Sequence, residues 1–346
     1  MILLEPAVAR NLDGTLPGLR CALQHAIELE HATLPTYLYA LYSLVPGKND
    51  RIAAVMLSVI LEEMLHMALA CNILNAVGGH PVIDTAAFVP TYPGPLPGGV
   101  ESQLQVPLSP FSLVLIENVF MVIEEPEDPL HFPVLVRESG QVTIGQFYES
   151  IKQTIVDLSK TQTIFTGDAS FQLTTGFPSS ELIAVNDVAS ASAAIETIVQ
   201  QGEGTSVSPL DPQHEPAHYY RYAEILYGRA LVKNPNPPPD FAYAGEPIPF
   251  DPGGVYPVVT NPAVVGYPPG SAAAYQNDTF NYTYTSLLKT LHTVFNGRPG
   301  ELPAAIGLME ALKELAFAMM SATPAGPGAV PGLNAGPSFQ YRATNP

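Results

Sequence analysis

Two Glu-x-x-His patterns, about 150 residues apart, are the strongest chemical signal in the sequence. Glu63 and His66 lie in the apolar segment 57–70, and Glu215 and His218 precede a second apolar, tyrosine-rich segment. Residues three apart share one face of a helix, so each pair could direct a carboxylate and an imidazole to one point. Such side chains are costly to bury unless they are paired or bind a metal ion. Two such pairs are typical of the core of di-iron and di-manganese carboxylate bundles.

A centre of this kind also takes one glutamate from each of two further helices. Glu30 lies in an apolar helical pattern and is the first of these, and Tyr37 is two turns along the same face. We therefore predict Tyr37 as a candidate catalytic residue with a redox role, although buried tyrosines more often serve packing. For the sixth ligand the sequence offers Glu117, Glu124 and Glu149. Carboxylates with imidazoles suit two iron ions, or manganese.

The segment from His214 to His218 also matches the His-Glu-x-x-His pattern of zinc peptidases. In those enzymes both histidines lie on one face of a helix, and the glutamate is the general base. Pro216 opposes this interpretation, because proline is tolerated only in the first turn of a helix. We expect the helix to begin near Glu215, with His214 outside it.

The elements that position these residues are long helices. Apolar residues at intervals of three and four predict helices over 16–44 and 50–77, and the short turn between them makes the two antiparallel. A Pro- and Gly-rich crossover over 80–107 then precedes a helix over 109–125. This connectivity is typical of ferritin-like bundles. Further helices are predicted at 143–159, 187–201, 215–231, 277–295 and 301–321.

The sequence thus predicts a mainly α protein, a ferritin-like four-helix bundle with a long crossover and extra helices. We expect the bundle to span residues 1–231 and a Pro-rich extended belt to follow over 232–276. Helices over 277–322 are expected to pack on the bundle. Residues 323–346, rich in Gly, Pro and Ala, are expected to form a loose tail.

The amino-acid composition limits the classes of partner that the protein could bind. The net charge is −18 and no run of Lys or Arg occurs, which opposes binding to nucleic acid or to an anionic membrane. The most apolar windows are interrupted by charges, so we expect no membrane span. Two cysteines and the absence of signal-peptide features fit a cytoplasmic location. The expected partner is a small-molecule substrate, and a homo-oligomer is compatible with the sequence.

Several segments together resemble one known family, and the resemblance covers about residues 15–231. The sequence is similar to the ferritin-like domain of the iminophenyl-pyruvate dimer synthase family, which is associated with bisindole pigment biosynthesis. The similar segments are 26–42, 62–66, 123–127, 144–148 and 218–225. The resemblance implies the ferritin-like fold and favours Glu124 as the sixth ligand, because Ile-Glu-x-Pro-Glu is a mark of the family. The family's Gly-Glu-Phe-Tyr element has Gln146 here, which weakens a ligand role for that helix. Synthases of these pathways join two indole imines oxidatively.

We therefore expect a di-metal carboxylate protein with oxidase, oxygenase or peroxide-consuming chemistry on a small substrate. A metal-binding or iron-storage-like protein without an organic substrate is the main alternative. A homologue whose polar cluster is closed by hydrogen bonds is a third interpretation, and a zinc metallopeptidase ranks last. The expected metal ligands are Glu30, Glu63, His66, Glu124, Glu215 and His218.

Overall fold

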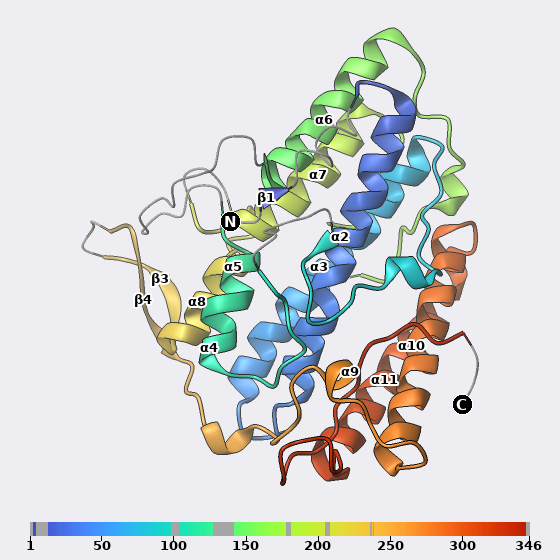
Figure 1. The fold of residues 1–346 in the computed structure, drawn as a ribbon. Coiled ribbons are helices and arrows are strands. Elements are labelled where there is room, and N and C mark those ends of the chain that lie inside the picture. The colour runs from blue at the N-terminus through green and yellow to red at the C-terminus, as the bar shows by residue number, and fades with distance from the viewer. Residues whose placement is uncertain are drawn as a thin grey trace.

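Two long antiparallel helices, α2 (Leu16–Tyr42) and α3 (Asp50–Ala76), form the centre of the molecule (Figure 1). The Thr15 hydroxyl caps the first turn of α2 by accepting the Gly18 amide. Both helices were predicted to within two residues. The computed structural model describes residues 3–4, 13–97, 104–126, 142–177, 181–204, 208–235, 237 and 239–343.

Shorter helices form a second layer against this pair. This layer has two rows, each made of two helical segments that lie roughly end to end (Figure 1). One row consists of α4, η3 and α5 and then α6, and the other consists of α7 and then α8. Helices α6 and α7 pack on each other and on α2 and α3, whereas α8 packs on α3 and on η3. The bounds are α4 Leu113–Leu115, the π-helical turn η3 Ile116–Phe120, α5 Met121–Ile123, α6 Ile144–Thr161, α7 Val188–Glu203 and α8 His218–Tyr227.

The remaining elements surround the bundle. Strand β1 (Leu3–Leu4) pairs antiparallel with β2 (Val142–Thr143), and β3 (Arg229–Lys233) pairs antiparallel with β4 (Phe241–Pro247), with Leu231 opposite Tyr243. The β3–β4 pair projects from the side of the bundle that carries α8 (Figure 1). The other helices are η1 Ala86–Phe88, η4 Ala169–Phe171, η6 Pro252–Gly254, α9 Pro262–Val265, α10 Ala272–Phe295, η7 Pro299–Glu301 and α11 Leu302–Ala322.

The Pro-rich segment after the bundle is held by backbone hydrogen bonds. Its first part forms the β3–β4 hairpin, and its later part runs across the turn between α2 and α3. There Tyr256 N donates to Ser43 O and Val45 N donates to Gly254 O, both at 2.8 Å. The described strand residues include only one proline, Pro247 at the end of β4, so the prolines of this segment take few hydrogen-bond donors from the ladder.

The chain after α11 is packed rather than loose, contrary to the prediction. Ala335 N donates to Thr323 O at 2.7 Å, which closes the segment on itself. Phe339 is 1% exposed and packs edge-on against Phe280 and Tyr284 of α10. Composition alone misled here, because a few apolar residues among the glycines and prolines supply the anchor.

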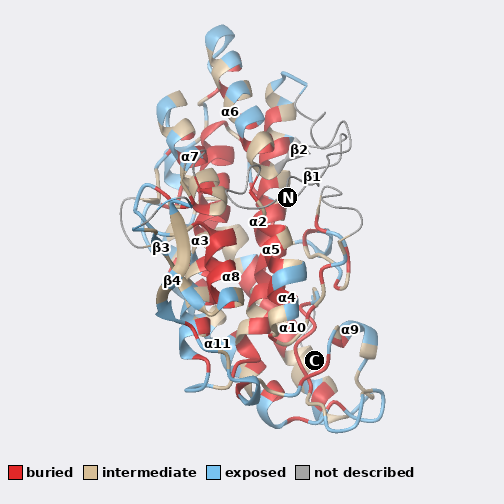
Figure 2. Cartoon of the chain, turned by 90° about the vertical axis from the view of Figure 1, so that its left-hand side faces the viewer, coloured by how far each residue is buried: buried red, intermediate tan, exposed pale blue. Residues whose placement is uncertain are grey.

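Burial is concentrated on α2, α3 and α8 (Figure 2). By length and composition α3 could cross a membrane, but 56% of its apolar window is buried inside the structure. Its position at the centre of the bundle accounts for its apolar composition.

Candidate metal centre

Five of the six predicted ligands converge at the level where the second-layer helices are interrupted. Two groups form, Glu30 with Glu63 and His66, and Glu63 with Glu124 and His218. In each group the three ligand atoms lie within 4.8 Å of one another, and Glu63 belongs to both. All five side chains are at most 9% exposed. This arrangement places two three-ligand sites side by side with one shared carboxylate.

Each carboxylate has one oxygen held by a hydroxyl of the protein. Tyr148 donates to Glu30 Oε1, and Tyr37 donates to Glu124 Oε1 at 2.5 Å. The Thr33 hydroxyl lies 2.9 Å from Glu63 Oε2. The other oxygen of each carboxylate faces a histidine Nδ1 atom. The outer oxygens are therefore held in place, and the inner ones are left for a ligand.

The two histidines follow the same pattern. His66 Nε2 is 2.9 Å from Gln201 Oε1, and His218 Nε2 is 3.1 Å from Glu62 Oε2. Both partners are acceptors, so each Nε2 carries a proton and each Nδ1 is the ring nitrogen that faces the carboxylates. The two rings stack with centroids 5.3 Å apart. Fixing a histidine tautomer through its second nitrogen is a recurrent feature of metal sites.

The Nδ1 atom of His218 tests whether the cluster fits metal ions. It lies 2.8 Å from Glu63 Oε1 and 3.3 Å from Glu124 Oε2, yet it is buried and makes no hydrogen bond. A cation between these atoms would satisfy all three. The donor set of three carboxylates and two imidazoles also suits first-row metals. The residues therefore fit a pair of divalent ions.

The electrostatics of the metal-free cluster also favour the binding of cations. Burial raises the pKa of Glu30 well above its usual range, and the neighbouring Glu63 charge adds to the shift. Burial and the Glu124 charge likewise raise the pKa of Glu63. Burial lowers the pKa of His66 to about 3, which keeps this imidazole neutral. The group disfavours joint ionisation of its acids unless positive charge is supplied.

A π-helical turn explains which glutamate of the third helix enters the centre. Glu117 lies within this turn and is exposed, whereas Glu124 follows α5 directly and is buried. An extra residue in a π turn rotates the following residues. The two glutamates consequently do not share a face, although they are seven residues apart. Glu149 is also exposed and lies 3.5 Å from Lys152, outside the cluster.

The prediction of Glu215 as a ligand is not supported, because α8 begins three residues later. Helix α8 starts at His218 after an extended Ala217, so Glu215 and His218 do not share a helical face. Pro216 pairs with Leu210 in a β-bridge, and Glu215 is exposed. It lines a second cavity of about 560 Å³ together with His214.

The zinc-peptidase arrangement is likewise not formed. His214 is exposed and outside the helix, with a left-handed φ of 67°. Among the described residues, the groups that could hold a metal ion include neither His214 nor Glu215.

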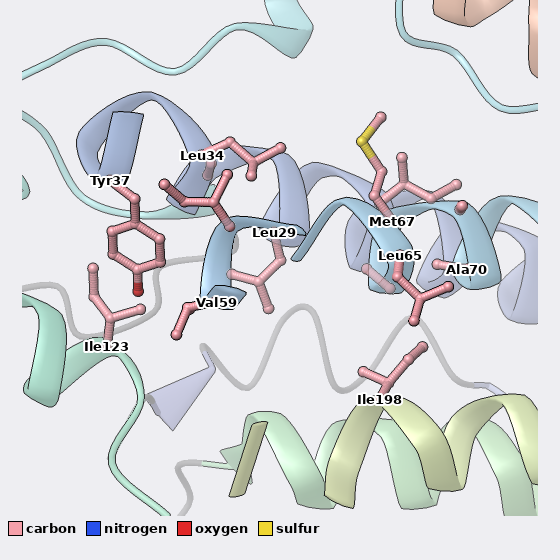
Figure 3. Packing of buried hydrophobic residues seen from close by; sticks show 14 of the residues in the cluster. Leu29, Leu34, Tyr37, Val59, Leu65, Met67, Ala70, Ile123 and Ile198 are labelled. Carbon is pink, nitrogen blue, oxygen red and sulfur yellow. The ribbon is translucent and has the colours of Figure 1, made fainter. Parts of the chain in front are cut away.

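Tyr37 contacts the centre through its hydroxyl. It is fully buried on α2, and its ring packs against Phe120 and Tyr222. Figure 3 shows Tyr37 beside Ile123, the residue that precedes Glu124. Its hydrogen bond to Glu124 makes it a positioning residue, and a catalytic role stays a prediction.

Four residues around the centre were not predicted as part of it. Glu62 and Tyr148 lie in segments 62–66 and 144–148, where the sequence resembles the iminophenyl-pyruvate dimer synthase family. Thr33 is one turn from Glu30, and its spacing could have indicated its role. Gln201 carries no signal in the sequence, because its contact with His66 depends on how α7 packs on α3.

A cavity of about 50 Å³ reaches the centre between α6 and α7. Its lining includes the ligands Glu30, Glu63, His66 and Glu124, together with apolar residues such as Ile123 and Ile198 and the carboxylates of Glu125 and Glu203. Figure 3 shows Ile198 pointing from α7 toward Leu65 of α3. A volume of this size holds roughly three to five water molecules.

Comparison with known proteins places the chain in a family. Residues 23–227 match the family described as Ferritin-like, so the chain belongs to it and the predicted fold class is confirmed. A ferritin-like protein from Caulobacter vibrioides has the same fold, with a TM-score of 0.59 and 24% identity over 95% of this chain and 99% of that one. Dichlorochromopyrrolate synthase from Lentzea aerocolonigenes is 24% identical over 97% of this chain. The chain spans 37% of the length of that relative.

Proposed function

We propose that this chain binds two metal ions, iron ahead of manganese, and uses them in oxidase, oxygenase or peroxide-consuming chemistry on a small substrate. The observation that carries the proposal is the orientation of the five side chains. In each of the five residues, one polar atom is hydrogen-bonded to a residue outside the cluster: a carboxylate oxygen of each glutamate and the Nε2 of each histidine. The second polar atom, a carboxylate oxygen or a histidine Nδ1, faces the other ligands. The five residues are Glu30, Glu63, His66, Glu124 and His218. The buried His218 Nδ1, which lies between Glu63 Oε1 and Glu124 Oε2, supports a cation at this point.

The roles of the protein groups follow from their contacts. Glu63 would be shared by the two ions, and Glu30 with His66 and Glu124 with His218 would complete the two sides. When bound, such an ion pair supplies positive charge, open coordination positions and redox capacity. Tyr37 and Tyr148 hold the outer carboxylates in place. The small volume of the cavity, about 50 Å³, limits water around the ions.

We propose an imine derived from an aromatic amino acid as the substrate class. The support is the 24% identity to dichlorochromopyrrolate synthase and the motifs shared with the iminophenyl-pyruvate dimer synthase family. Joining two such molecules with loss of two electrons and two protons needs an oxidant, and dioxygen or peroxide is the class that the cavity admits. The cavity of about 50 Å³ is far smaller than the roughly 300–1,000 Å³ of pockets that enclose organic ligands. The organic substrate would therefore react from the mouth of the cavity.

The small cavity also supports a second candidate, a metal-binding or iron-storage-like protein without an organic substrate. A space that holds only ions, water, dioxygen or peroxide is sufficient for iron uptake and oxidation. The two candidates share the metal centre and differ in whether an organic molecule is consumed.

Elemental analysis and turnover together test the proposal. Protein purified after growth with iron is expected to hold two metal ions per chain, and the variant Glu215→Gln should hold the same amount. Ferrous iron and dioxygen are then supplied with and without the imine of an aromatic 2-keto acid. Imine-dependent oxidant consumption supports the enzyme, and equal consumption in both supports the second candidate. No bound metal under any loading condition contradicts both.

A further inference from the structure

The two sides of the centre are alike in their carboxylates. Glu30 and Glu124 each accept a tyrosine hydroxyl on one oxygen and face a histidine Nδ1 with the other. Glu63 is common to both sides. The partners of the two Nε2 atoms, by contrast, differ in charge.

Behind His66 lies a neutral group. The Nε2–H of His66 donates to Gln201 Oε1 at 2.9 Å, and Gln201 is 2% exposed. No carboxylate among the described residues is bonded to this Nε2. The amide fixes the ring and its tautomer but contributes no net charge.

Behind His218 lies a charged group. The Nε2–H of His218 donates to Glu62 Oε2 at 3.1 Å. The other oxygen of Glu62 accepts Arg221 Nη1 at 2.8 Å. Arg221 is itself fixed, because its Nε donates to Pro216 O at 2.6 Å and its Nη1 lies 3.1 Å from Ser58 Oγ. This ion pair holds the Glu62 carboxylate in contact with the imidazole.

A carboxylate that accepts the imidazole N–H makes the opposite nitrogen a better donor to a metal ion. A neutral amide has the weaker effect. Arg221 offsets part of the Glu62 charge, but it lies beyond the carboxylate, so the nearer negative group dominates at His218.

We propose that the two metal positions are unequal, and that the Glu62 carboxylate makes the position at His218 bind a divalent ion more tightly than the position at His66. This inference rests on the proposed di-metal centre and goes beyond it. It assigns Glu62 and Gln201 as the positioning residues that set the two affinities.

Calorimetric titration of the metal-free full chain with Co²⁺ tests the inference. Two binding steps of different affinity are expected, and the visible spectrum of bound Co²⁺ follows each step. His218→Gln should remove the tighter step, and His66→Gln should remove the weaker one. Glu62→Gln should weaken the tighter step about 10- to 100-fold, the usual effect of losing such a partner, and leave the weaker step unchanged.

The exchange Gln201→Glu provides the reciprocal variant, and it should strengthen the weaker step. It also covers the case in which Glu62→Gln fails to fold. A purely structural role for Glu62 would weaken both steps together or lower the melting temperature without separating them. Two equal steps in the wild type, or an effect of Glu62→Gln on both steps, would overturn the inference and leave the di-metal centre intact. No binding of Co²⁺ by the wild type would refute the centre itself.

Discussion

Replacing Glu63 by Gln should change stability in opposite directions with and without metal. Glu63 is the carboxylate shared by the two ligand groups, and its neighbours Glu30 and Glu124 lie within 4.8 Å of it. Two unit charges at that separation repel by about 3–4 kcal/mol at an effective dielectric constant of about 20. The metal-free protein relieves part of this repulsion by protonation, because burial raises the pKa of Glu63.

The metal-free Glu63→Gln protein is therefore expected to be more stable than the metal-free wild type, by about 1–4 kcal/mol. The amide keeps an oxygen for the Thr33 hydroxyl. Loss of the Glu63 charge also removes one cause of the raised pKa of His218, so a neutral His218 can accept the new NH₂ group at its Nδ1. The shape of the side chain is conserved, so no cavity forms. In the presence of metal the order should reverse. Each ion present at 100 times its Kd stabilises the wild type by about 2.7 kcal/mol, and the variant loses this contribution.

Urea unfolding followed by circular dichroism, with EDTA and with saturating Fe²⁺ or Mn²⁺, measures both differences. Glu215→Gln is the matched control, and it should behave as the wild type in both conditions. A metal-free Glu63→Gln protein that is less stable than the metal-free wild type, together with a wild type that metal does not stabilise, would refute the reasoning. The cluster would then be a structural network in which Glu63 is an ordinary hydrogen-bond partner.

Three further outcomes are expected. Metal binding should release protons and weaken as the pH falls, because the pKa values of Glu30 and His218 lie above their usual range without metal. Burial is the main cause at Glu30, whereas at His218 the neighbouring carboxylates outweigh the opposing effect of burial. Calorimetry in buffers of different ionisation enthalpy measures this release, and binding without proton exchange would contradict it. Gly202→Leu should slow Co²⁺ uptake without changing the final metal content, since Gly202 lines the cavity and a Cβ there meets nothing within 4 Å; stopped-flow absorption measures the rate, and an unchanged rate would place the entrance elsewhere. Gly167→Ala should destabilise the fold by about 1–3 kcal/mol, because its Cβ would lie 1.7 Å from Asn75 O; thermal unfolding measures the loss.

The sequence was sufficient to predict helices and ligand positions where the helical spacing of apolar residues is long and uninterrupted. The spacing of apolar residues predicted α2 and α3 closely, and the spacing of charged residues within them placed Glu30, Glu63 and His66. These positions depend only on local helical geometry, which a sequence encodes directly.

Predictions were weaker where helices are interrupted. The spacing of Glu215 and His218 suggested one helix, but the chain before His218 is extended and pairs with Leu210. The π turn after α4 changed the face on which Glu124 lies relative to Glu117. Both features depend on packing between distant segments. The contact of Gln201 with His66 is of the same kind, since it links two helices that are far apart in the sequence.

The location of bound metal tests the central claim most directly. Crystals of iron-loaded protein, measured at wavelengths above and below the iron absorption edge, reveal each ion in an anomalous difference map. We predict two peaks, one between Glu30, Glu63 and His66 and one between Glu63, Glu124 and His218. Density at neither position in crystals soaked with iron, or a metal ion held instead by His214 and Glu215, would contradict the account.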